Sequence, residues 1–195
     1  ALLARFLPSV VSSARASRVP CKVTVIDNQS SDDSVLFLKD NFPEVDVFLA
    51  SENKVLCSYN EAAAFYDEDV LIFLNNDILT DEGFVDPLVS VFSEHSDAFF
   101  ASSYGDRSLP VFRWGILGVD IYYEGFHMAI PRKGYPLSAG IGAFDRKKFL
   151  DLGGYDPMYL PGYYEDLDLC YRGWKKGYKG YYVPEAHQFH VGSAS

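Results

Sequence analysis

The sequence predicts an α/β domain in which helices cover both faces of a mostly parallel central sheet. Strand-like and helix-like runs alternate through the first half of the chain, as they do when crossover helices connect parallel strands. The run 70–74, VLIFL, is apolar throughout, as in a central strand covered on both faces. With 195 residues, 48% of them hydrophobic and 16% aromatic, the chain fits one domain with a substantial core.

The first half supplies the clearest elements. The opening residues 1–8 are typical of the interior of a helix. The β-branched run 22–27 is typical of a buried strand that is followed by a turn. A serine and two acids favour a helix start near 31. The remaining expected elements of this half are a strand at 45–50, an alanine-rich helix at 59–66, the strand 70–74, a helix at 80–95 that Pro87 could kink, and a strand at 98–101.

The second half is less regular. Residues 102–136 contain many aromatic residues and glycines without a clean period, so only one strand is expected there, near 119–123. A strand at 138–144, helices at 146–152 and 166–176, and a strand at 180–183 follow. One domain is expected, with 1–101 and 102–195 as its two halves.

Charge and cysteine content narrow the possible partners. The 27 acidic and 17 basic residues leave a net charge of -10, which disfavours nucleic acid and anionic membranes as partners. A phosphate-bearing ligand would therefore need local positive charge, such as a metal ion. Cys21, Cys57 and Cys170 are scattered and form no CxxC pair, which fits a reducing cytoplasm rather than a zinc site or a disulfide framework. No apolar run is long enough for a membrane span, and no signal peptide is recognisable.

A carboxylate follows the apolar strand directly, in Asn75-Asn76-Asp77. Ligands of open α/β sheets bind beyond the carboxyl ends of strands, and a hard oxygen donor there could hold magnesium or manganese bridging two phosphates. A plain turn explains the same residues, because Asn and Asp favour turns.

Acidic residues also gather at 163–168, YYEDLD. Glu165 and Asp166 fall in the first turn of the expected helix, where they could cap it, or where one of them could act as the base that deprotonates an acceptor hydroxyl. Asp168 and Arg172 have the spacing of an ordinary i,i+4 ion pair. Helical spacing assigns Leu167, Cys170, Tyr171 and Trp174 to the core.

Histidines and glycines give weaker signals. His190 could join Asp77 on a metal if the fold brings them together, but late histidines such as His187 and His190 are more often surface or core residues. Gly140 and Gly142 allow a ligand to approach a strand, although a bulge explains them equally well. Neither GxGxxG nor GxxxxGK[ST] is present, which disfavours dinucleotide enzymes and P-loop NTPases.

The order and spacing of these segments resemble the family 2 glycosyltransferases of GT-A fold, especially their rhamnosyltransferase-like branch. The resemblance covers 3–195, and it is most specific in SAGIGAF (138–144), GGYD (153–156) and YEDLDLCYR (164–172). VIDNQSSDDS (25–34) matches the family's donor-binding turn, and LNND (74–77) its DXD metal motif. The family normally opens with a strand, and that strand is expected to precede Ala1.

The resemblance implies a role for each matching residue. Asp27 and Asn28 would belong to the donor turn, Asn53 and Asn60 to the adjoining donor-side segment, and Asn76 would face ribose or phosphate. Asp77 and His190 would hold Mg²⁺ or Mn²⁺, and Asp166, with Glu165 as the neighbouring candidate, would be the acceptor base. Two features depart from the family pattern: Val55 stands where a glycine is frequent, and Asn75 replaces the first acid of DXD.

The implied function is inverting transfer of a sugar from a UDP- or dTDP-sugar to a glycan or lipid-linked acceptor in surface polysaccharide synthesis. Acceptor choice would lie in 102–136, where Trp114, Tyr122, Tyr123 and Phe126 could stack on a sugar ring, although most aromatic residues in such a region simply pack. The enzyme would act in the cytoplasm, with possible peripheral association at the inner membrane face. A non-catalytic sugar-nucleotide or glycan-binding domain of the same fold is the alternative. A nucleotidyltransferase would share the architecture, but its glycine-rich basic loop is missing from the sequence.

Overall fold

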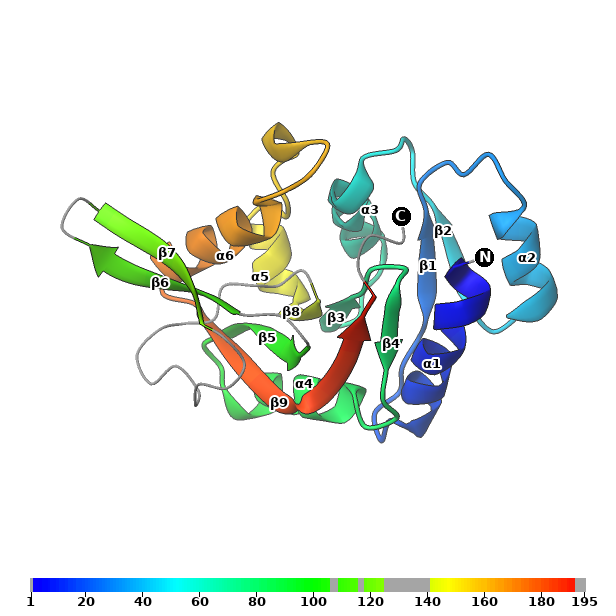
Figure 1. The fold of residues 1–195 in the computed structure, drawn as a ribbon, viewed down its shortest axis with the longest axis horizontal. Coiled ribbons are helices and arrows are strands. Elements are labelled where there is room, and N and C mark those ends of the chain that lie inside the picture. The colour runs from blue at the N-terminus through cyan, green and yellow to red at the C-terminus, as the bar shows by residue number, and fades with distance from the viewer. Residues whose placement is uncertain (1, 106–108, 116–117, 125–140, 192–195) are drawn as a thin grey trace.

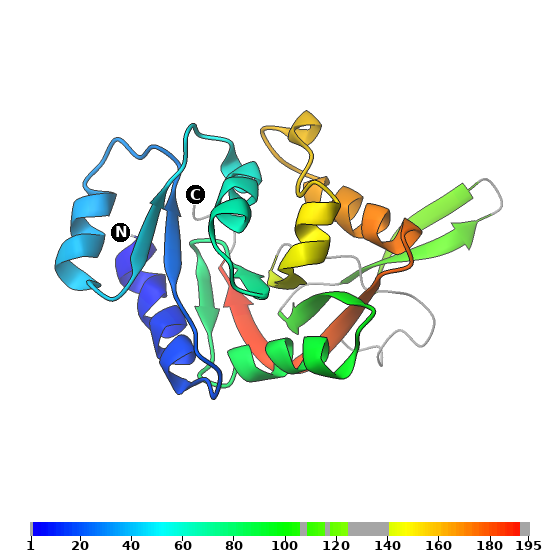
Figure 2. The same cartoon turned by 180° about the vertical axis from the view of Figure 1, so that it is seen from behind.

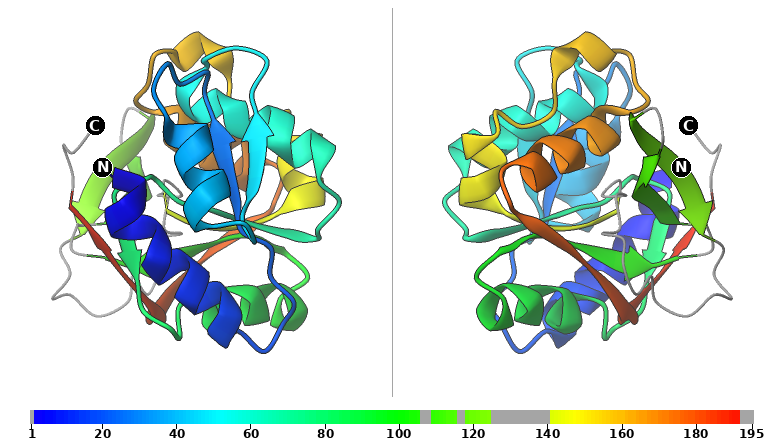
Figure 3. Two further views of the ribbon diagram at one scale, coloured as in Figure 1. Left: turned by 90° about the vertical axis from the view of Figure 1, so that its right-hand side faces the viewer. Right: turned by 90° about the vertical axis from the view of Figure 1, so that its left-hand side faces the viewer.

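The computed structural model describes residues 2–105, 109–115, 118–124 and 141–191, with the backbone alone for 109–124. It confirms an α/β fold in which helices cover both faces of a central sheet (Figure 1). Figure 3 shows the layers from two sides, with α4 below the sheet and α3, α5 and α6 above it.

The first half of the chain holds the parallel strands β1 and β2 and the apolar strand β3, which leads to Asp77. Its elements are α1 (Leu2–Ala16), β1 (Thr24–Asp27), α2 (Ser34–Asn41), β2 (Asp46–Leu49), the 3₁₀ helix η1 (Val55–Cys57), α3 (Ser58–Phe65), β3 (Val70–Phe73), β4 (Ile78–Thr80), α4 (Val85–Glu94) and β5 (Ala98–Tyr104).

The second half adds a hairpin, the helix that carries the paired acids, and a long final strand. Its elements are β6 (Leu109–Gly115), β7 (Gly118–Glu124), β8 (Gly142–Asp145), α5 (Arg146–Asp151), the 3₁₀ helix η2 (Pro157–Tyr159), α6 (Glu165–Lys175) and β9 (Lys179–His190). The antiparallel β6–β7 hairpin projects from the body beside α6 (Figure 2). Phe126 and residues 138–140 lie outside the described residues.

The central sheet is mixed, with the strand order β3-β8-β5-β9-β4. Only β5 and β9 pair in parallel, whereas β3–β8, β5–β8 and β4–β9 are antiparallel; β1 and β2 form a separate parallel pair. The expectation of a mostly parallel sheet was therefore wrong in this respect. Hydrophobic pattern shows which residues are buried but not the direction of the neighbouring strand, and β8 inserts between two strands from the first half.

Each face of the sheet has its own core. Ala143 and Phe144, neighbours on β8, belong to different clusters because successive side chains of a strand point to opposite faces. Phe144 packs with Phe73 of β3, Phe149 of α5 and Tyr155, on the side of α3, α5 and α6. Ala143 belongs to the cluster around α4. Because alternate side chains must enter opposite cores, the pairing register of the strands is fixed, and with it the positions of the strand ends.

Two elements differ from expectation in a way that matters for the site. The helix expected at 80–95 begins later, because Thr80 ends the strand β4, which pairs with β9, and α4 begins only at Val85. Pro87 then lies in the first turn of α4, where a helix needs no N–H donor, so it causes no break. The last strand does not end at Val183 but continues to His190.

Expected core positions on α6 are partly confirmed. Leu167 and Cys170 are buried, whereas Tyr171 and Trp174 are only half-buried. The other buried residues of α6 are Glu165, Leu169 and Gly173. Gly142 on β8 faces the backbone of β5, since a Cβ atom there would lie 2.4 Å from the Ala101 carbonyl oxygen. Strand packing, rather than a ligand, therefore explains this glycine.

A side-chain clamp joins α3 to the segment that follows α5. The Asn60 amide on α3 donates to the Tyr155 carbonyl oxygen at 2.8 Å, and its Oδ1 accepts from the Tyr155 N–H at 2.9 Å. Gly153 and Gly154 have φ values of 82° and 68°, in the left-handed region. A Cβ atom on Gly154 would lie 2.2 Å from Asn60 Oδ1, so a larger residue there would break the clamp.

We expect Gly154→Ala to lower the free energy of unfolding by about 2–4 kcal/mol, through backbone strain and loss of the Asn60 clamp. Gly153→Ala is the matched control, because its backbone is also left-handed but nothing lies within 4 Å of its Cβ position. It should lose only the strain, about 1–2 kcal/mol. Urea unfolding of both variants measures the difference, and equal losses would contradict a role for the clamp.

Candidate active site

Asp77 and His190 meet at one edge of the central sheet. Asp77 follows β3 in a turn, and antiparallel pairing of β4 with β9 places Ile78 opposite His190. His190 Nε2 lies 3.0 Å from Asp77 Oδ1, and their side chains are 16% and 6% exposed. The Asp77 carbonyl oxygen also accepts from the Val191 N–H at 3.2 Å. The fold thus brings these two residues together, which is the condition under which His190 could join Asp77 on a metal.

This pair fits a divalent metal in part. A carboxylate oxygen and an imidazole nitrogen form a donor set suited to Mn²⁺ and similar ions. Within the described ranges, no group of three or more His, Cys, Asp or Glu side chains is close enough to hold a metal ion. The protein would therefore supply two of these ligands, leaving positions for oxygens of a bound substrate.

Other residues of this edge have different surroundings. Asn76 is exposed in the same turn, where a ligand could reach it, and Asn75 is half-buried. His187 lies three residues before His190, with its Nδ1 3.7 Å from Asp81 Oδ2 and both side chains largely exposed. It thus forms a surface contact and is not part of the Asp77–His190 pair.

The predicted donor-side residues organise two loops. The Asp27 carboxylate accepts weakly from the Ser30 N–H at 3.3 Å. Asn28 Oδ1 accepts from the Ser58 hydroxyl at the start of α3, and its Nδ2 donates to the Val55 carbonyl oxygen at 3.3 Å. The β1 loop is thereby tied to η1. Whether these side chains also contact a nucleotide stays a prediction.

Val55 adopts a strained backbone conformation in η1. Its φ is 50°, a left-handed value that β-branched residues rarely adopt, and the residue is 43% exposed. Asn53 Oδ1 accepts from the Val55 N–H at 3.2 Å, so hydrogen bonds hold Val55 from both sides. A glycine would take this conformation without strain, which gives a physical reason for the glycine frequent at this position in the family that the sequence resembles.

Asn60 makes a structural contact that the sequence did not indicate, and its place in the donor-side segment stays a prediction. Tyr155 backbone atoms engage both ends of its side-chain amide, so the structure shows Asn60 as a clamp. No sequence pattern predicted this contact, because the two residues come from distant segments.

Glu165 and Asp166 lie in the first turn of α6, as expected. Neither of them is a fully exposed residue that only caps the helix. Burial is the main cause that raises the pKa of Asp166 to about 6, the charge of Glu165 adds to the rise, and a hydrogen bond from the Leu167 N–H opposes it. A carboxylate with this pKa can accept a proton near neutral pH. Glu165 is 6% exposed, and its Oε2 has no hydrogen-bond partner among the described residues.

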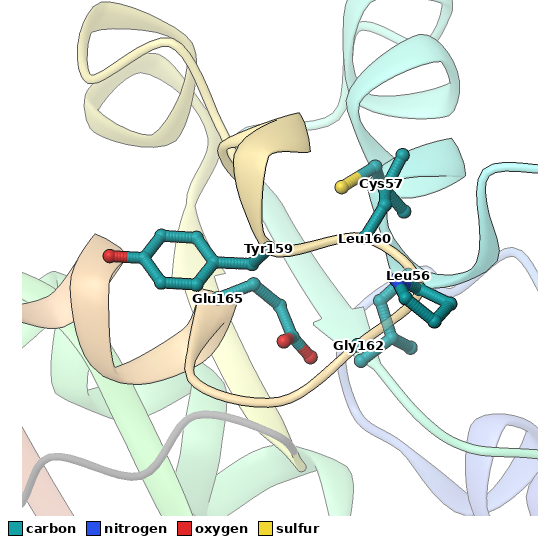
Figure 4. A pocket seen from close by; sticks show the side chains of 7 residues that line it. Leu56, Cys57, Tyr159, Leu160, Gly162 and Glu165 are labelled. Carbon is teal, nitrogen blue, oxygen red and sulfur yellow. The ribbon is translucent and has the colours of Figure 1, made fainter.

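A small recess lies in front of Glu165. Its lining comes from η1, the loop after η2 and the start of α6: Leu56, Cys57, Tyr159, Leu160, Pro161, Gly162 and Glu165. Figure 4 shows the Glu165 carboxylate pointing between Tyr159 and Gly162. The recess is thus apolar apart from one carboxylate.

Arg172 connects α6 to the segment that follows α5. It pairs with Asp168 at 2.7 Å, as the i,i+4 spacing predicted, and donates to the carbonyl oxygens of Leu152 and Gly154. Two side chains, Asn60 and Arg172, therefore hold the same glycine-containing segment.

The mixed sheet, the Asp77–His190 pair beyond β3 and the acids of α6 define a GT-A-type α/β domain. The chain belongs to glycosyl transferase family 2, whose sequence profile matches residues 1–151. No curated protein matches the chain significantly in sequence.

Solved structures show the same fold at low sequence identity. The chain is similar to GalNAc-T7, solved with UDP, GalNAc and Mn²⁺, with a TM-score of 0.75, 19% identity, and coverage of 97% of this chain and 41% of that one. It is also similar to TarS of S. aureus, with a TM-score of 0.67, 12% identity, and coverage of 97% and 35%. The chain thus spans less than half the length of either protein. Among the described residues, no helix combines the length and apolar character needed to cross a membrane.

The raised pKa of Asp166 predicts a stability gain on its replacement. Because the folded pKa lies above the ordinary value of 3.8, ionisation of the half-buried Asp166 carboxyl costs stability as pH rises from about 4 to 6. We expect Asp166→Asn to be more stable than the parent at pH 7.5, by about 1–3 kcal/mol. The gain should shrink at pH 4, where the carboxyl is largely neutral in the folded state. Urea unfolding at the two pH values tests this, and a pH-independent difference would contradict it.

Proposed function

We propose that this chain is the catalytic part of an inverting, metal-dependent glycosyltransferase that uses a UDP- or dTDP-sugar. The observation that carries the proposal is the contact of the buried Asp77 with His190 beyond the end of β3. In open α/β sheets this is where ligands bind. The family assignment supports the proposal, and the UDP and Mn²⁺ in the GalNAc-T7 structure support a nucleotide and a divalent ion.

The residues divide the chemistry between them. Asp77 and His190 would hold Mg²⁺ or Mn²⁺, which when bound would neutralise the leaving diphosphate. Asp27, Asn28, Asn53 and Asn76 would face the nucleotide. Asp166 would take the proton of the acceptor hydroxyl while that oxygen bonds to the anomeric carbon. The bond to the diphosphate oxygen breaks on the opposite side, so the anomeric centre inverts.

The finer assignments rest on sequence resemblance. A glycan or lipid-linked acceptor, a rhamnosyltransferase-like activity in surface polysaccharide synthesis, and action in the cytoplasm at the inner membrane face belong to the same proposal. A binding domain without turnover is the second candidate, favoured by the strained Val55 beside the predicted donor loop.

Metal-dependent nucleotide binding tests the first part. We expect UDP-, dTDP- or GDP-sugars to raise the melting temperature of the chain with Mn²⁺ and not with EDTA, because a ligand of the native state stabilises it. Asp77→Ala should abolish the shift. Asp81→Ala is the matched control, since it removes the carboxylate of the exposed Asp81–His187 contact instead. Normal metal-dependent binding in Asp77→Ala would refute its role as a ligand.

Turnover tests the second part, followed as release of nucleoside diphosphate from the donor that gives the melting shift. Asp166→Asn should bind the donor normally but turn it over about 10²–10⁴-fold more slowly, the usual contribution of a general base. The parent rate should fall as pH drops below about 6, where Asp166 takes up a proton. Asp151→Asn, which alters an exposed carboxylate paired with Lys176, is the control. Near-normal turnover of Asp166→Asn would move the base elsewhere, first to Glu165. If the parent protein binds the donor but does not turn it over, the second candidate, a binding domain without turnover, is correct.

A further inference from the structure

Each polar group of Ser51 is bound by a side chain from another segment of the chain. Ser51 lies two residues after β2, in the loop that leads to η1. Its N–H and its hydroxyl donate to the two carboxylate oxygens of Glu61 on α3, at 3.0 and 2.7 Å. Its carbonyl oxygen accepts from the side-chain amide of Gln29, in the loop after β1, at 2.8 Å. Ser51 thus joins α3 to the loops that follow the neighbouring strands β1 and β2 (Figure 1).

Glu61 is the acceptor on the α3 side of this contact. Its side chain is 27% exposed, and its Oε1 also lies 3.5 Å from Lys54 Nζ. The hydrogen bonds from the N–H and the hydroxyl of Ser51 are the main causes that lower the pKa of the Glu61 carboxyl. The carboxyl is therefore ionised at neutral pH, and both of its oxygens are available as acceptors.

Gln29 reaches Ser51 from a strained backbone conformation. Its φ is 63°, in the left-handed region that is costly for a residue with a side chain. Its amide nitrogen also lies 3.3 Å from the carbonyl oxygen of Ala50, a second and weaker acceptor. Backbone strain of this kind is found mainly at functional sites, where the surrounding contacts maintain it. The hydrogen bonds of Gln29 to the loop after β2 are such contacts.

The contact sets the separation of two loops that are predicted to bind the donor. One loop begins at Asp27, at the end of β1, and the other contains Asn53. A ligand that touches both loops binds more tightly when they are already ordered, because ordering a loop on binding costs affinity. We propose that Glu61 and Gln29 are positioning residues, which hold the two loops in the arrangement that binds the nucleotide, with Ser51 as their shared partner. This inference rests on the proposed function.

Glu61→Gln tests the α3 side of the contact. A Gln side chain has one acceptor oxygen instead of two, so the N–H and the hydroxyl of Ser51 can no longer donate to separate oxygens. The loops are then correctly placed in only a fraction of the molecules, and the apparent Kd rises in inverse proportion to that fraction. We expect the Kd of UDP or dTDP in the presence of Mn²⁺, measured by calorimetry, to rise about 5- to 20-fold.

Gln29→Ala tests the other side of the contact and should weaken binding in the same direction. Because both side chains act on Ser51, the double variant should lose less affinity than the product of the two single losses. The melting temperature of each variant without nucleotide should stay within a few degrees of the parent, since the contact lies at the surface. Single losses that multiply fully in the double variant would contradict a shared partner.

Glu52→Gln is the matched control. It removes a carboxylate that pairs with Lys54 at 2.7 Å but makes no hydrogen bond to Ser51 within the described part of the chain. Its Kd for the same nucleotide should stay within about twofold of the parent. An equal loss in Glu52→Gln and Glu61→Gln would assign the effect to the charges around Lys54 and overturn the inference.

Steady-state kinetics separates positioning from catalysis. With the donor that gives the melting shift, Glu61→Gln should raise KM about as much as it raises Kd and leave kcat within about twofold, because a saturating donor itself holds the loops in place. A fall in kcat at unchanged KM would contradict a positioning role.

Failure of this inference differs from failure of the proposed function. If the parent binds UDP or dTDP with Mn²⁺ and Glu61→Gln binds it equally well, the positioning role is wrong and the proposed function stands. If the parent shows no Mn²⁺-dependent nucleotide binding, the proposed function is wrong, and this inference falls with it.

Discussion

The antiparallel pairing of β4 with β9 is the constraint on which the candidate site depends. β4 follows the turn that contains Asp77, and β9 ends at His190, so the register Ile78↔His190 brings a carboxylate and an imidazole to 3.0 Å. Burial of Asp77 makes this contact specific, because a buried carboxylate requires a partner. The parallel pairing of β9 with β5 anchors the same strand at its other end, in the middle of the sheet. Core packing on both faces therefore sets the geometry of the pair.

The acids of α6 depend on a second set of long-range contacts. Arg172 binds the carbonyl oxygens of Leu152 and Gly154, and Asn60 binds the backbone of Tyr155, so one short segment connects α6 with α3. This segment needs left-handed glycines and leaves no room for a side chain on Gly154. A rigid support of this kind holds the half-buried Asp166 carboxyl in place, where partial burial raises its pKa. The segments around the recess in front of Glu165 contain Val55, Tyr163 and Tyr164, all with left-handed backbone. Their strained conformations lower the stability of the fold locally.

Much of the local structure could be predicted from the sequence. The apolar run 70–74 identified the strand β3, the alanine-rich segment identified α3, and the paired acids identified the start of α6, because each signal depends on neighbouring residues. The sequence also supported a contact between Asp77 and His190, although only through resemblance to a family. By contrast, the three residues of β4 are too few to show a period, so this strand was not predicted and Thr80 was assigned to the following helix. The Asp32 carboxylate, rather than a capping serine, accepts from the first N–H of α2.

The sequence by itself determined the α/β class, the order of most elements and the identity of the chemical groups at 77, 165, 166 and 190. Those properties follow from composition and short-range periodicity, which every stretch of chain carries locally. Only the tertiary structure decided strand direction, the length of β9, the clamp role of Asn60 and the left-handed tyrosines. Each of these depends on a partner that is distant in the sequence or on a backbone conformation imposed by packing. A residue's own type and its neighbours do not specify either, so they emerged only when the chain was folded.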